Sequence, residues 1–350
     1  MPPLYVVEQG ARLHQDGRRL LVKKEDEVAR DHAPGTSSIE RDRVRELSST
    51  PLVNVSEVVL MGNVGLTTPV IKLLLAEKLD VVFLTEDGEY CGRLTGPATP
   101  HVLLRRKQYE CQTDAAFGLQ MAQRFVQGKL ANARVLVQRH NRERNDAVIE
   151  RAVDALAQAT ARAERTTQLN ALNGVEGAAT AAYFGAWKRL LKPAWQFEKR
   201  MRRPPPDPIN VLLSFGYTLL ARTAYGAVEA AGLDPYAGFL HAVEYNRPSL
   251  ALDLMEEFRA VVDGVVLWCV NSGQIVPEEF TKGDTARPVV MGAKAKRTFI
   301  LAYERRMDET ILYPRLNERL AVRRCIQAQA RAIVDCIQRR APDYVPMYFR

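Results

Sequence analysis

The sequence changes character at "TGPATPHVLLRRKQYECQ", residues 95–112. The first seven residues, TGPATPH, combine glycine with two prolines, a composition typical of turns. Before this stretch, short segments rich in β-branched and aromatic residues predict strands. After it, apolar residues recur every three or four positions, which predicts helices. The pattern therefore predicts an α+β multidomain chain, with a small β-rich N-terminal domain (residues 1–96) and a larger all-α domain (residues 101–350).

Five segments of the first hundred residues carry the strand pattern, and one carries the helical pattern. The segment at 67–79, TTPVIKLLLAEKL, has helical periodicity and a proline in its first turn. The polar segment at 25–43 has neither pattern, which predicts an inserted loop or a partly disordered segment. The predicted strands are LYVVEQG (4–10), RRLLVKK (18–24), NVSEVVLMG (54–62), DVVFLT (80–85) and EYCGRL (89–94).

A run of prolines interrupts the helical region. Because consecutive prolines cannot continue a helix, one helix is predicted to end before Pro204. Asp207 is a suitable N-cap and Pro208 suits the first helical position, so the next helix is predicted to begin near Pro208.

The composition favours an anionic partner in a reducing compartment. Lysine and arginine outnumber aspartate and glutamate by 49 to 41, for a formal charge of +8, which favours polyanions without identifying one. The five cysteines form no CxxC pair, which indicates reduced thiols and a cytoplasmic location. We expect no membrane association, because the N-terminus lacks a signal-peptide pattern and no apolar run reaches about 18 residues.

Several nucleotide-binding and hydrolase signatures are missing from the sequence. It contains no GxxxxGK[ST] loop, no GxGxxG after a strand, no GxSxG and no HExxH. ATP hydrolysis, dinucleotide redox chemistry and esterase activity therefore lack their usual residues.

Glu176 lies between two glycines in a segment that is otherwise helical, LNGVEGAATAAYFGAW (172–187). Each glycine in a helix interior costs about 1 kcal/mol relative to alanine, so Gly174 and Gly177 need a reason. Small neighbours would let a metal ion or a phosphate backbone approach Glu176. Alternatively, another helix packs closely on the glycines and Glu176 is merely exposed.

The stretch GFLHAVEYNRPSLALDLMEEFR (238–259) places His241 ahead of a helix that is predicted to begin near Leu250, with Ser249 as its cap. Asp253 and Glu256 are three residues apart and share the face opposite the apolar stripe. Such a pair fits a metal site in a cleft and an ordinary wet surface equally well. An imidazole with carboxylates suits manganese or magnesium, although a lone histidine is more often a core residue.

Four basic clusters in the helical region mix arginine or lysine with aromatic or amide residues, which suits contacts to nucleic-acid phosphates. Each cluster taken singly fits a solvated helix face as well. The clusters and two nearby tyrosines give these DNA-binding candidates: Arg105, Arg106, Arg139, Arg142, Lys188, Arg202, Arg203, Tyr183 and Tyr217. For the tyrosines, packing in the interior with a satisfied hydroxyl is the alternative.

Four motifs occur in order: LNGVEG (172–177), PPPDPINVLLSFGYTLL (204–220), GLDPYAGFLH (232–241) and RPSLALDLMEEFR (247–259). Together they resemble the CRISPR-associated adaptation integrases, which insert new spacers into CRISPR arrays. The resemblance implies that Glu176, His241 and Glu256 are catalytic and bind Mg²⁺ or Mn²⁺, with Asp253 close by. In some members of the family an aspartate stands in place of Glu256.

The resemblance also implies partners and a reaction. The β-rich domain would form a homodimer, and a small adaptation protein would bridge two dimers on double-stranded DNA. The reaction would join the 3′-hydroxyl of prespacer DNA to a CRISPR repeat by transesterification, and the same site would act as an endonuclease with water. A transposase of the same superfamily and a DNA-binding scaffold without activity are the alternatives. One departure is Asn246, where the family pattern has glycine.

Overall fold

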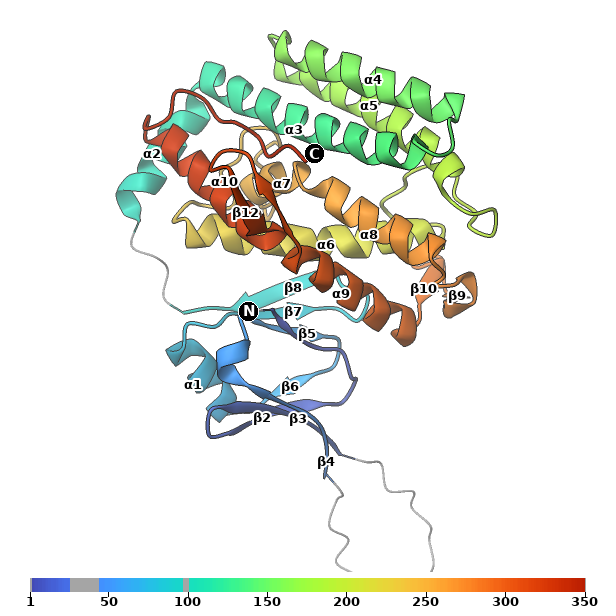
Figure 1. The fold of residues 1–350 in the computed structure, drawn as a ribbon. Helices are drawn as coiled ribbons and strands as arrows, with labels where there is room; N and C mark the ends of the chain where they lie inside the picture. The colour runs from blue at the N-terminus through green and yellow to red at the C-terminus, as the bar shows by residue number, and fades with distance from the viewer. Residues whose placement is uncertain (1, 26–43, 97–100, 350) are drawn as a thin grey trace, which may run out of the picture. The chain divides into compact units, whose positions relative to one another are not determined.

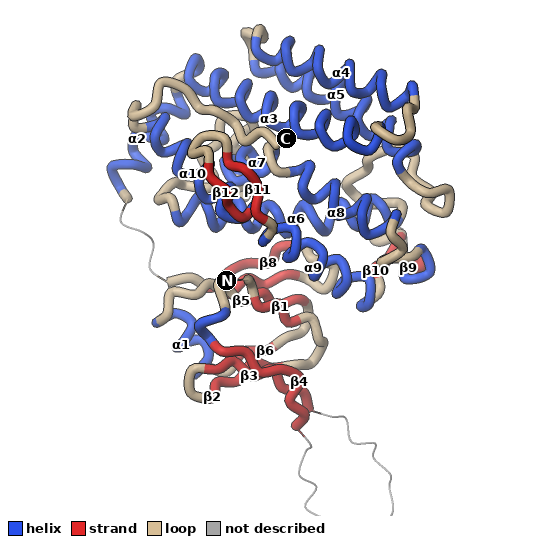
Figure 2. The backbone as a smooth tube through the Cα atoms, in the orientation of Figure 1, coloured by secondary structure: helices blue, strands red, loops and turns tan. Residues whose placement is uncertain are grey.

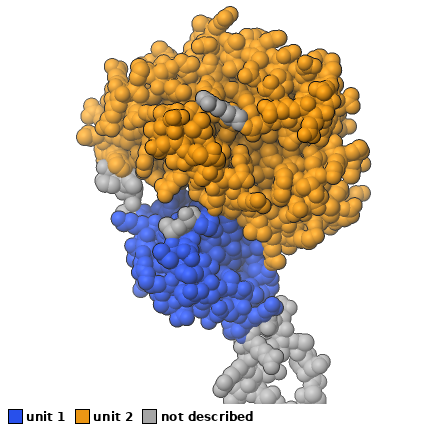
Figure 3. Space-filling view, in the orientation of Figure 1, with its two compact units in different colours: residues 1–98 blue, residues 99–350 orange. Residues whose placement is uncertain are grey.

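The computed structural model describes residues 2–25, 44–96 and 101–349. The chain divides into two compact units, residues 1–98 and 99–350, which are coloured separately in Figure 3. The predicted inserted loop at 25–43 lies outside the described residues except for Glu25, the last residue of a strand. Residues 97–100 of the predicted turn also lie outside them.

Two four-stranded sheets make up most of the first unit (Figure 2). The strand orders are β1-β5-β7-β8 and β4-β3-β2-β6. β1, β5 and β7 pair in parallel and β8 is antiparallel to β7. The strands are β1 (Leu4–Val6), β2 (Arg12–Asp16), β3 (Arg19–Glu25), β4 (Val44–Pro51), β5 (Val58–Met61), β6 (Gly65–Leu66), β7 (Val81–Leu84) and β8 (Tyr90–Leu94).

Every predicted strand segment overlaps one of these strands, but β2, β4 and β6 were not predicted. β2 reads RLHQD and β4 reads VRELSSTP, so polar residues hide their strand character, and β6 has only two residues. A 3-10 helix, η1 (Leu52–Asn54), follows β4. The predicted helix is α1 (Thr68–Ala76), and Pro69 lies in its first turn.

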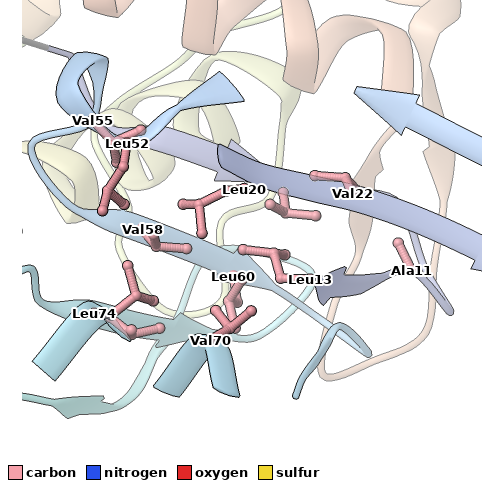
Figure 4. Packing of buried hydrophobic residues seen from close by; sticks show 12 residues of the cluster. Ala11, Leu13, Leu20, Val22, Leu52, Val55, Val58, Leu60, Val70 and Leu74 are labelled. Atoms are coloured by element: carbon pink, nitrogen blue, oxygen red, sulfur yellow. The ribbon is translucent and has the colours of Figure 1, made fainter. Parts of the chain in front are cut away.

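The core of the first unit consists of aliphatic side chains from both sheets and α1 (Figure 4). Alternate residues of a strand point to opposite faces, so each sheet can contribute one apolar face. Leu13 and Leu20 of the second sheet, Val58 of the first, and Val70 and Leu74 of α1 are all fully buried.

The second unit is built mainly from helices (Figure 1). α3, α4 and α5 pack against one another, and α6 packs against α7, α8 and α10. α7 and α8 both contact α3, so they join these two groups of helices. The helices are α2 (Val102–Thr113), α3 (Ala115–Asn141), α4 (Ala147–Glu164), α5 (Leu169–Leu190), α6 (Pro208–Ala230), α7 (Ser249–Glu256), α8 (Arg259–Asn271), α9 (Ala293–Asp308) and α10 (Val322–Ile337).

The prediction of a purely helical second domain is corrected by two small antiparallel sheets. β9 (Phe280–Lys282), which follows the 3-10 helix η2 (Pro277–Glu279), pairs with β10 (Val289–Met291). β11 (Thr310–Tyr313) pairs with β12 (Glu318–Ala321). These strands have three or four residues each, too few for a clear period.

The predicted break at the prolines is confirmed. α5 ends at Leu190, and α6 begins at Pro208. The Asp207 carboxylate accepts a hydrogen bond from the Asn210 backbone nitrogen at 2.8 Å, as an N-cap does.

α6 is long and apolar enough to cross a membrane by length and composition alone. However, 61% of its most apolar window is buried inside the protein. This burial is typical of a core helix in a helical domain.

The stretch that follows His241 forms two helices rather than one, because α7 ends at Glu256 and α8 begins at Arg259. The predicted cap is also wrong. Ser249 is the first residue of α7, and its hydroxyl donates to the Ala242 carbonyl at 2.9 Å. Ser249 therefore ties α7 to the loop that carries His241.

All five cysteines are free. Cys91 is exposed and the other four are buried. Burial raises the pKa of the Cys269 thiol to about 12, so this residue is packed as an uncharged group.

Candidate active site and its cation cluster

The carboxylates of Glu176 and Glu256 meet at the side chain of Lys129. Glu176 comes from α5, Glu256 from the last turn of α7 and Lys129 from the middle of α3. The Lys129 ammonium contacts Glu176 Oε1 and lies 2.8 Å from Glu256 Oε2. Arg259, at the start of α8, places its Nε 2.7 Å from the same Oε2. We call these four residues the cation cluster.

His241 lies at the edge of the cation cluster, where Asp253 fixes its ring. Its Nδ1 is 2.7 Å from Asp253 Oδ1, and its Nε2 is 3.8 Å from Glu256 Oε1. The Asp253 carboxylate also accepts hydrogen bonds from the backbone nitrogens of residues 239, 240 and 241. In the neutral tautomer whose Nδ1 donates to a carboxylate, Nε2 is available as a metal ligand, the arrangement found in metal sites.

Gly238 allows this loop to approach α7. A Cβ on Gly238 would lie 2.6 Å from the Ser249 backbone carbon and 2.8 Å from Asp253 Oδ2. Any side chain there would push the loop away from Asp253, and His241 with it. The φ angle of Asn246, in the same loop, is 60°. Glycine and asparagine both tolerate this left-handed conformation, which explains the departure at Asn246.

The wet-surface alternative for Asp253 and Glu256 is wrong. Asp253 is fully buried and Glu256 is 3% exposed, so neither lies on a solvated helix face. The apolar stripe on the opposite side is buried as predicted: Leu254, Met255, Phe258, Val262, Val265 and Val266. The two carboxylates face α3 and the loop of His241 instead of solvent.

The glycines beside Glu176 leave open space and do not pack against a helix. A Cβ at Gly174 or Gly177 would meet no other atom within 4 Å. The helix-packing alternative is therefore wrong. Glu176 itself is partly buried and also accepts a hydrogen bond from the Thr180 hydroxyl at 2.8 Å.

Nearby cations keep both glutamates ionised. Burial by itself raises the pKa of Glu256, but Arg259 and Lys129 outweigh burial and hold it well below its usual range. Burial likewise raises the pKa of Glu176, and Lys129 lowers it below the ordinary value. Metals bind carboxylates in the ionised form, so both groups are in the state a metal requires.

The donor set suits a hard divalent ion. Two ionised carboxylates and an imidazole match the preferences of Mg²⁺ and Mn²⁺. Glu256 Oε2 is buried and has two cationic neighbours, the Lys129 ammonium at 2.8 Å and Arg259 Nε at 2.7 Å. Within residues 2–25, 44–96 and 101–349, no three His, Cys, Asp or Glu side chains are already grouped tightly enough to hold a metal.

Tyr183 and Tyr217 lie in the interior rather than on a DNA-binding surface. Both are buried, and their hydroxyls donate to Asp263 Oδ2 at 2.7 Å and Oδ1 at 2.5 Å. They line a cavity of about 40 Å³ together with Lys129 and Arg259. The prediction that they contact DNA is corrected to the packed alternative, because their hydroxyls are satisfied by Asp263.

The predicted basic DNA contacts are mostly exposed but do not gather at the cation cluster. Arg106, Arg139, Arg142, Lys188, Arg202 and Arg203 are exposed, and Arg105 is half-buried with its Nε donating to the Gly232 carbonyl at 3.4 Å. Arg202 borders the cavity beside the cluster. Arg106 pairs with Glu110 on the same helix. Contact of these residues with DNA remains a prediction.

Two charged residues of the site were not predicted. Lys129 lies within QGKLANAR on α3, far from Glu176 in sequence, and no local pattern links the two. Arg259 lies in the stretch after His241, but no role was predicted for it. Its spacing of three residues from Glu256, across the junction of two consecutive helices, is the pattern that could have identified it.

The chain matches the family model described as CRISPR associated protein Cas1 over residues 4–305. It is 38% identical over 349 residues to CRISPR-associated endonuclease Cas1 3 of Thermus thermophilus, covering 99% of this chain and 97% of that protein. Two solved structures share the fold. A casposase bound to integration product has a TM-score of 0.82 at 20% identity, covering 100% and 95% of the two chains. A Cas6-RT-Cas1–Cas2 complex has a TM-score of 0.80 at 24% identity, covering 99% and 36%.

Proposed function

The chain belongs to the Cas1 family of CRISPR-associated proteins, and we propose that it is a CRISPR adaptation integrase with endonuclease activity. The observation that carries the proposal is the meeting of Glu176 and Glu256 at one cationic position, beside a histidine oriented by Asp253. Glu176 comes from α5, and the loop and helix that supply His241 and Glu256 lie 65 residues or more further along the chain.

We propose that Glu176, His241 and Glu256 hold Mg²⁺ or Mn²⁺. Such an ion polarises a phosphodiester and stabilises the negative charge that develops during its attack. The support is the chemistry of the donors: both carboxylates are kept ionised, and Asp253 directs the free Nε2 of His241 toward Glu256.

The proposed reaction exchanges one phosphodiester for another. The 3′-hydroxyl of the prespacer gives up its proton as its oxygen forms a bond to phosphorus in the repeat. The bond from that phosphorus to the adjacent 3′-oxygen of the repeat breaks, and the departing oxygen takes up a proton. With water as the attacking group, the same site cleaves DNA. The protein acts by alignment and charge stabilisation, so no covalent protein intermediate is needed.

The proposed partners are double-stranded DNA, a second copy of the chain and a small adaptation protein. A prespacer and a CRISPR repeat would be the DNA substrates, with homodimerisation through the first unit. The charge of +8 supports binding to DNA. A structural relative is a complex that contains Cas1 and Cas2, and another is a casposase bound to integration product. We propose a cytoplasmic location, in keeping with the free cysteines.

Two alternatives are less well supported. The likeness to a casposase at 20% identity concerns the fold alone, whereas a protein named a Cas1 endonuclease is 38% identical over nearly the whole chain. A transposase is therefore not favoured. An inactive scaffold would have no need for buried, ionised carboxylates at a shared cation.

Joining of prespacer DNA to a supercoiled plasmid that carries a repeat, with and without Mn²⁺, tests the proposal. We expect metal-dependent joined product from the wild type, and we expect Glu176→Ala and His241→Ala each to abolish it while the DNA affinity measured without metal changes little. Joining that persists in both variants would contradict the ligand assignment. DNA binding without joined product under any metal condition would favour the scaffold.

A further inference from the structure

Lys129 has an unusual environment for a lysine. Its side chain is only 11% exposed, whereas lysine is almost never buried unless it is paired. Its ammonium contacts Glu176 and lies 2.8 Å from Glu256, so it lies between two of the proposed ligands rather than beside them. A positively charged group thus occupies the position that suits a divalent ion.

The cation cluster is electrically balanced without any metal. The two carboxylates of Glu176 and Glu256 are matched by the two cations Lys129 and Arg259. A divalent ion added to these four side chains leaves two excess positive charges in a poorly solvated site. Excess charge of one sign in such a site is unfavourable unless a counter-ion accompanies it or one cation moves away.

The two cations differ in how firmly they are held. The Arg259 guanidinium lies over the Tyr217 ring, 4.5 Å from its centre, and this stacking fixes it in the interior. The Lys129 ammonium sits on a flexible four-carbon stem. Lys129 also borders a cavity of about 40 Å³, which is lined as well by Thr180 and Arg202. Lys129 therefore has a flexible stem and adjoining space, whereas Arg259 is held by its stacking on Tyr217.

We propose, on the basis of the metal-dependent function above, that Lys129 is a positioning residue that occupies the place of the divalent ion, yields it when the ion binds, and then pairs with a DNA phosphate. In the absence of metal, the lysine holds the two carboxylates together and prevents their mutual repulsion. When the ion binds, the displaced ammonium turns toward the cavity that Arg202 also lines, where a phosphate can neutralise it. Metal binding and DNA binding then favour each other.

The first test measures Mn²⁺ affinity by calorimetry without DNA for the wild type, Lys129→Met and Lys294→Met. Lys294 is the matched control, since it also pairs with a glutamate, Glu279, but on the surface of α9. Removing the competing ammonium should tighten Mn²⁺ binding by about tenfold or more, within the usual range of coupling between sites. Lys294→Met should bind as the wild type does.

Thermal unfolding separates this role from a structural one. Lys129→Met should unfold at a lower temperature than the wild type without metal, because two carboxylates lose a shared cation. Saturating Mn²⁺ should restore most of the unfolding temperature that Lys129→Met loses. A lysine that merely supports the fold would give the same loss with and without Mn²⁺, and this result would overturn the proposal.

The coupling to DNA is measured by the affinity for a labelled duplex with and without Mn²⁺. Mn²⁺ should strengthen binding in the wild type and in Lys294→Met, and strengthen it less in Lys129→Met, because linkage is reciprocal. An equal gain in all three proteins would contradict the phosphate contact.

Lysine-specific labelling of the wild type with mass spectrometry keeps the proposal testable if Lys129→Met does not fold. Reactivity of Lys129 should rise when Mn²⁺ is added and fall again with DNA, while Lys294 stays constant. Mn²⁺ binding that leaves Lys129 reactivity unchanged would overturn the inference and leave the proposed function intact. Failure of the wild type to bind Mn²⁺ would instead overturn the proposed function.

Discussion

The helical unit contains buried carboxylates of two kinds, which differ in their partners. In the cation cluster, Glu176 and Glu256 face lysine and arginine. Elsewhere, Asp263 accepts hydrogen bonds from Tyr183 and Tyr217. Glu257 accepts them from Tyr344, Gln329 and the backbone nitrogen of Met347. We call the surroundings of Asp263 and Glu257 the neutral networks.

The partners decide the charge of each group. Burial raises the pKa of Asp263 to about 6 and that of Glu257 to about 7. Their hydrogen-bond donors only partly offset the burial, and at Asp263 the charges of Arg259 and Arg200 add a smaller offset. In the cation cluster, full charges outweigh the same burial penalty and lower the pKa of Glu256. Glu256 and Glu257 are neighbours in sequence with opposite shifts. Burial alone therefore does not decide whether a carboxylate is ionised, whereas a cationic partner favours the ionised form.

The same substitution at these adjacent positions should give the largest contrast. Glu256→Gln should lower plasmid joining by about a thousandfold, because losing a metal ligand forfeits several kcal/mol of charge stabilisation. Glu257→Gln should keep joining within about threefold, since the amide oxygen can accept from Gln329 and the Met347 nitrogen while its NH₂ group donates to the Tyr344 hydroxyl. Quantified joining in Mn²⁺ is the measurement. Equal losses in both variants would remove the distinction between the two groups.

Glu257→Ala tests the neutral network through stability. The Tyr344 hydroxyl, Gln329 amide and Met347 nitrogen would lose their acceptor in the interior, at a cost of about 3 kcal/mol in free energy of unfolding. Urea unfolding of this variant beside Glu257→Gln provides the measurement. The C-terminal segment around Met347 should loosen first, and an unchanged midpoint would show that Glu257 is not holding it.

Asp253→Asn weakens the orientation of His241 without removing a proposed ligand. An amide cannot accept all of the hydrogen bonds that the two carboxylate oxygens accept from the loop and from Nδ1. Mn²⁺ affinity should fall by about 10 to 100-fold, the usual effect of losing a group that orients a histidine ligand. Calorimetric titration of the wild type and Asp253→Asn with Mn²⁺ measures this change in affinity. Wild-type affinity in a folded variant would mean that His241 needs no such support.

The pH dependence of stability gives the smallest effect. The pKa of Asp263 is raised to about 6 in the folded state from an ordinary value near 3.8, so the folded protein binds more protons between these values. Its stabilising contribution is present below about pH 4 and is lost as the pH rises through about 6. The slope should not exceed about 1.4 kcal/mol per pH unit. Asp263→Asn should flatten this part of the profile, and an unchanged slope would mean that another group produces it.

Much of the fold could be predicted from local pattern. Segments rich in β-branched and aromatic residues predicted β1, β3, β5, β7 and β8, and the proline run predicted the break before α6. The failures have local causes as well. Polar residues hid β2 and β4, and one apolar stripe across residues 254–266 concealed the break between α7 and α8. Such a stripe continues when two consecutive helices bury the same side.

The candidate site was predicted in part. The motifs marked Glu176, His241 and Glu256, but helical spacing left Asp253 and Glu256 equally compatible with solvent and with a cleft. Only the packing of α7 against α3 and the His241 loop decided between them. The same holds for Tyr183 and Tyr217, whose hydroxyls meet Asp263 on a different helix.

The sequence by itself determined the β-rich and helical parts, the basic character of the chain and the family motifs. These features depend on residue type and on neighbours a few positions away. The tertiary structure alone decided that Lys129 lies between Glu176 and Glu256, 47 residues from the first in sequence. Pairing between charges depends on distance in space, and packing of separate helices sets that distance.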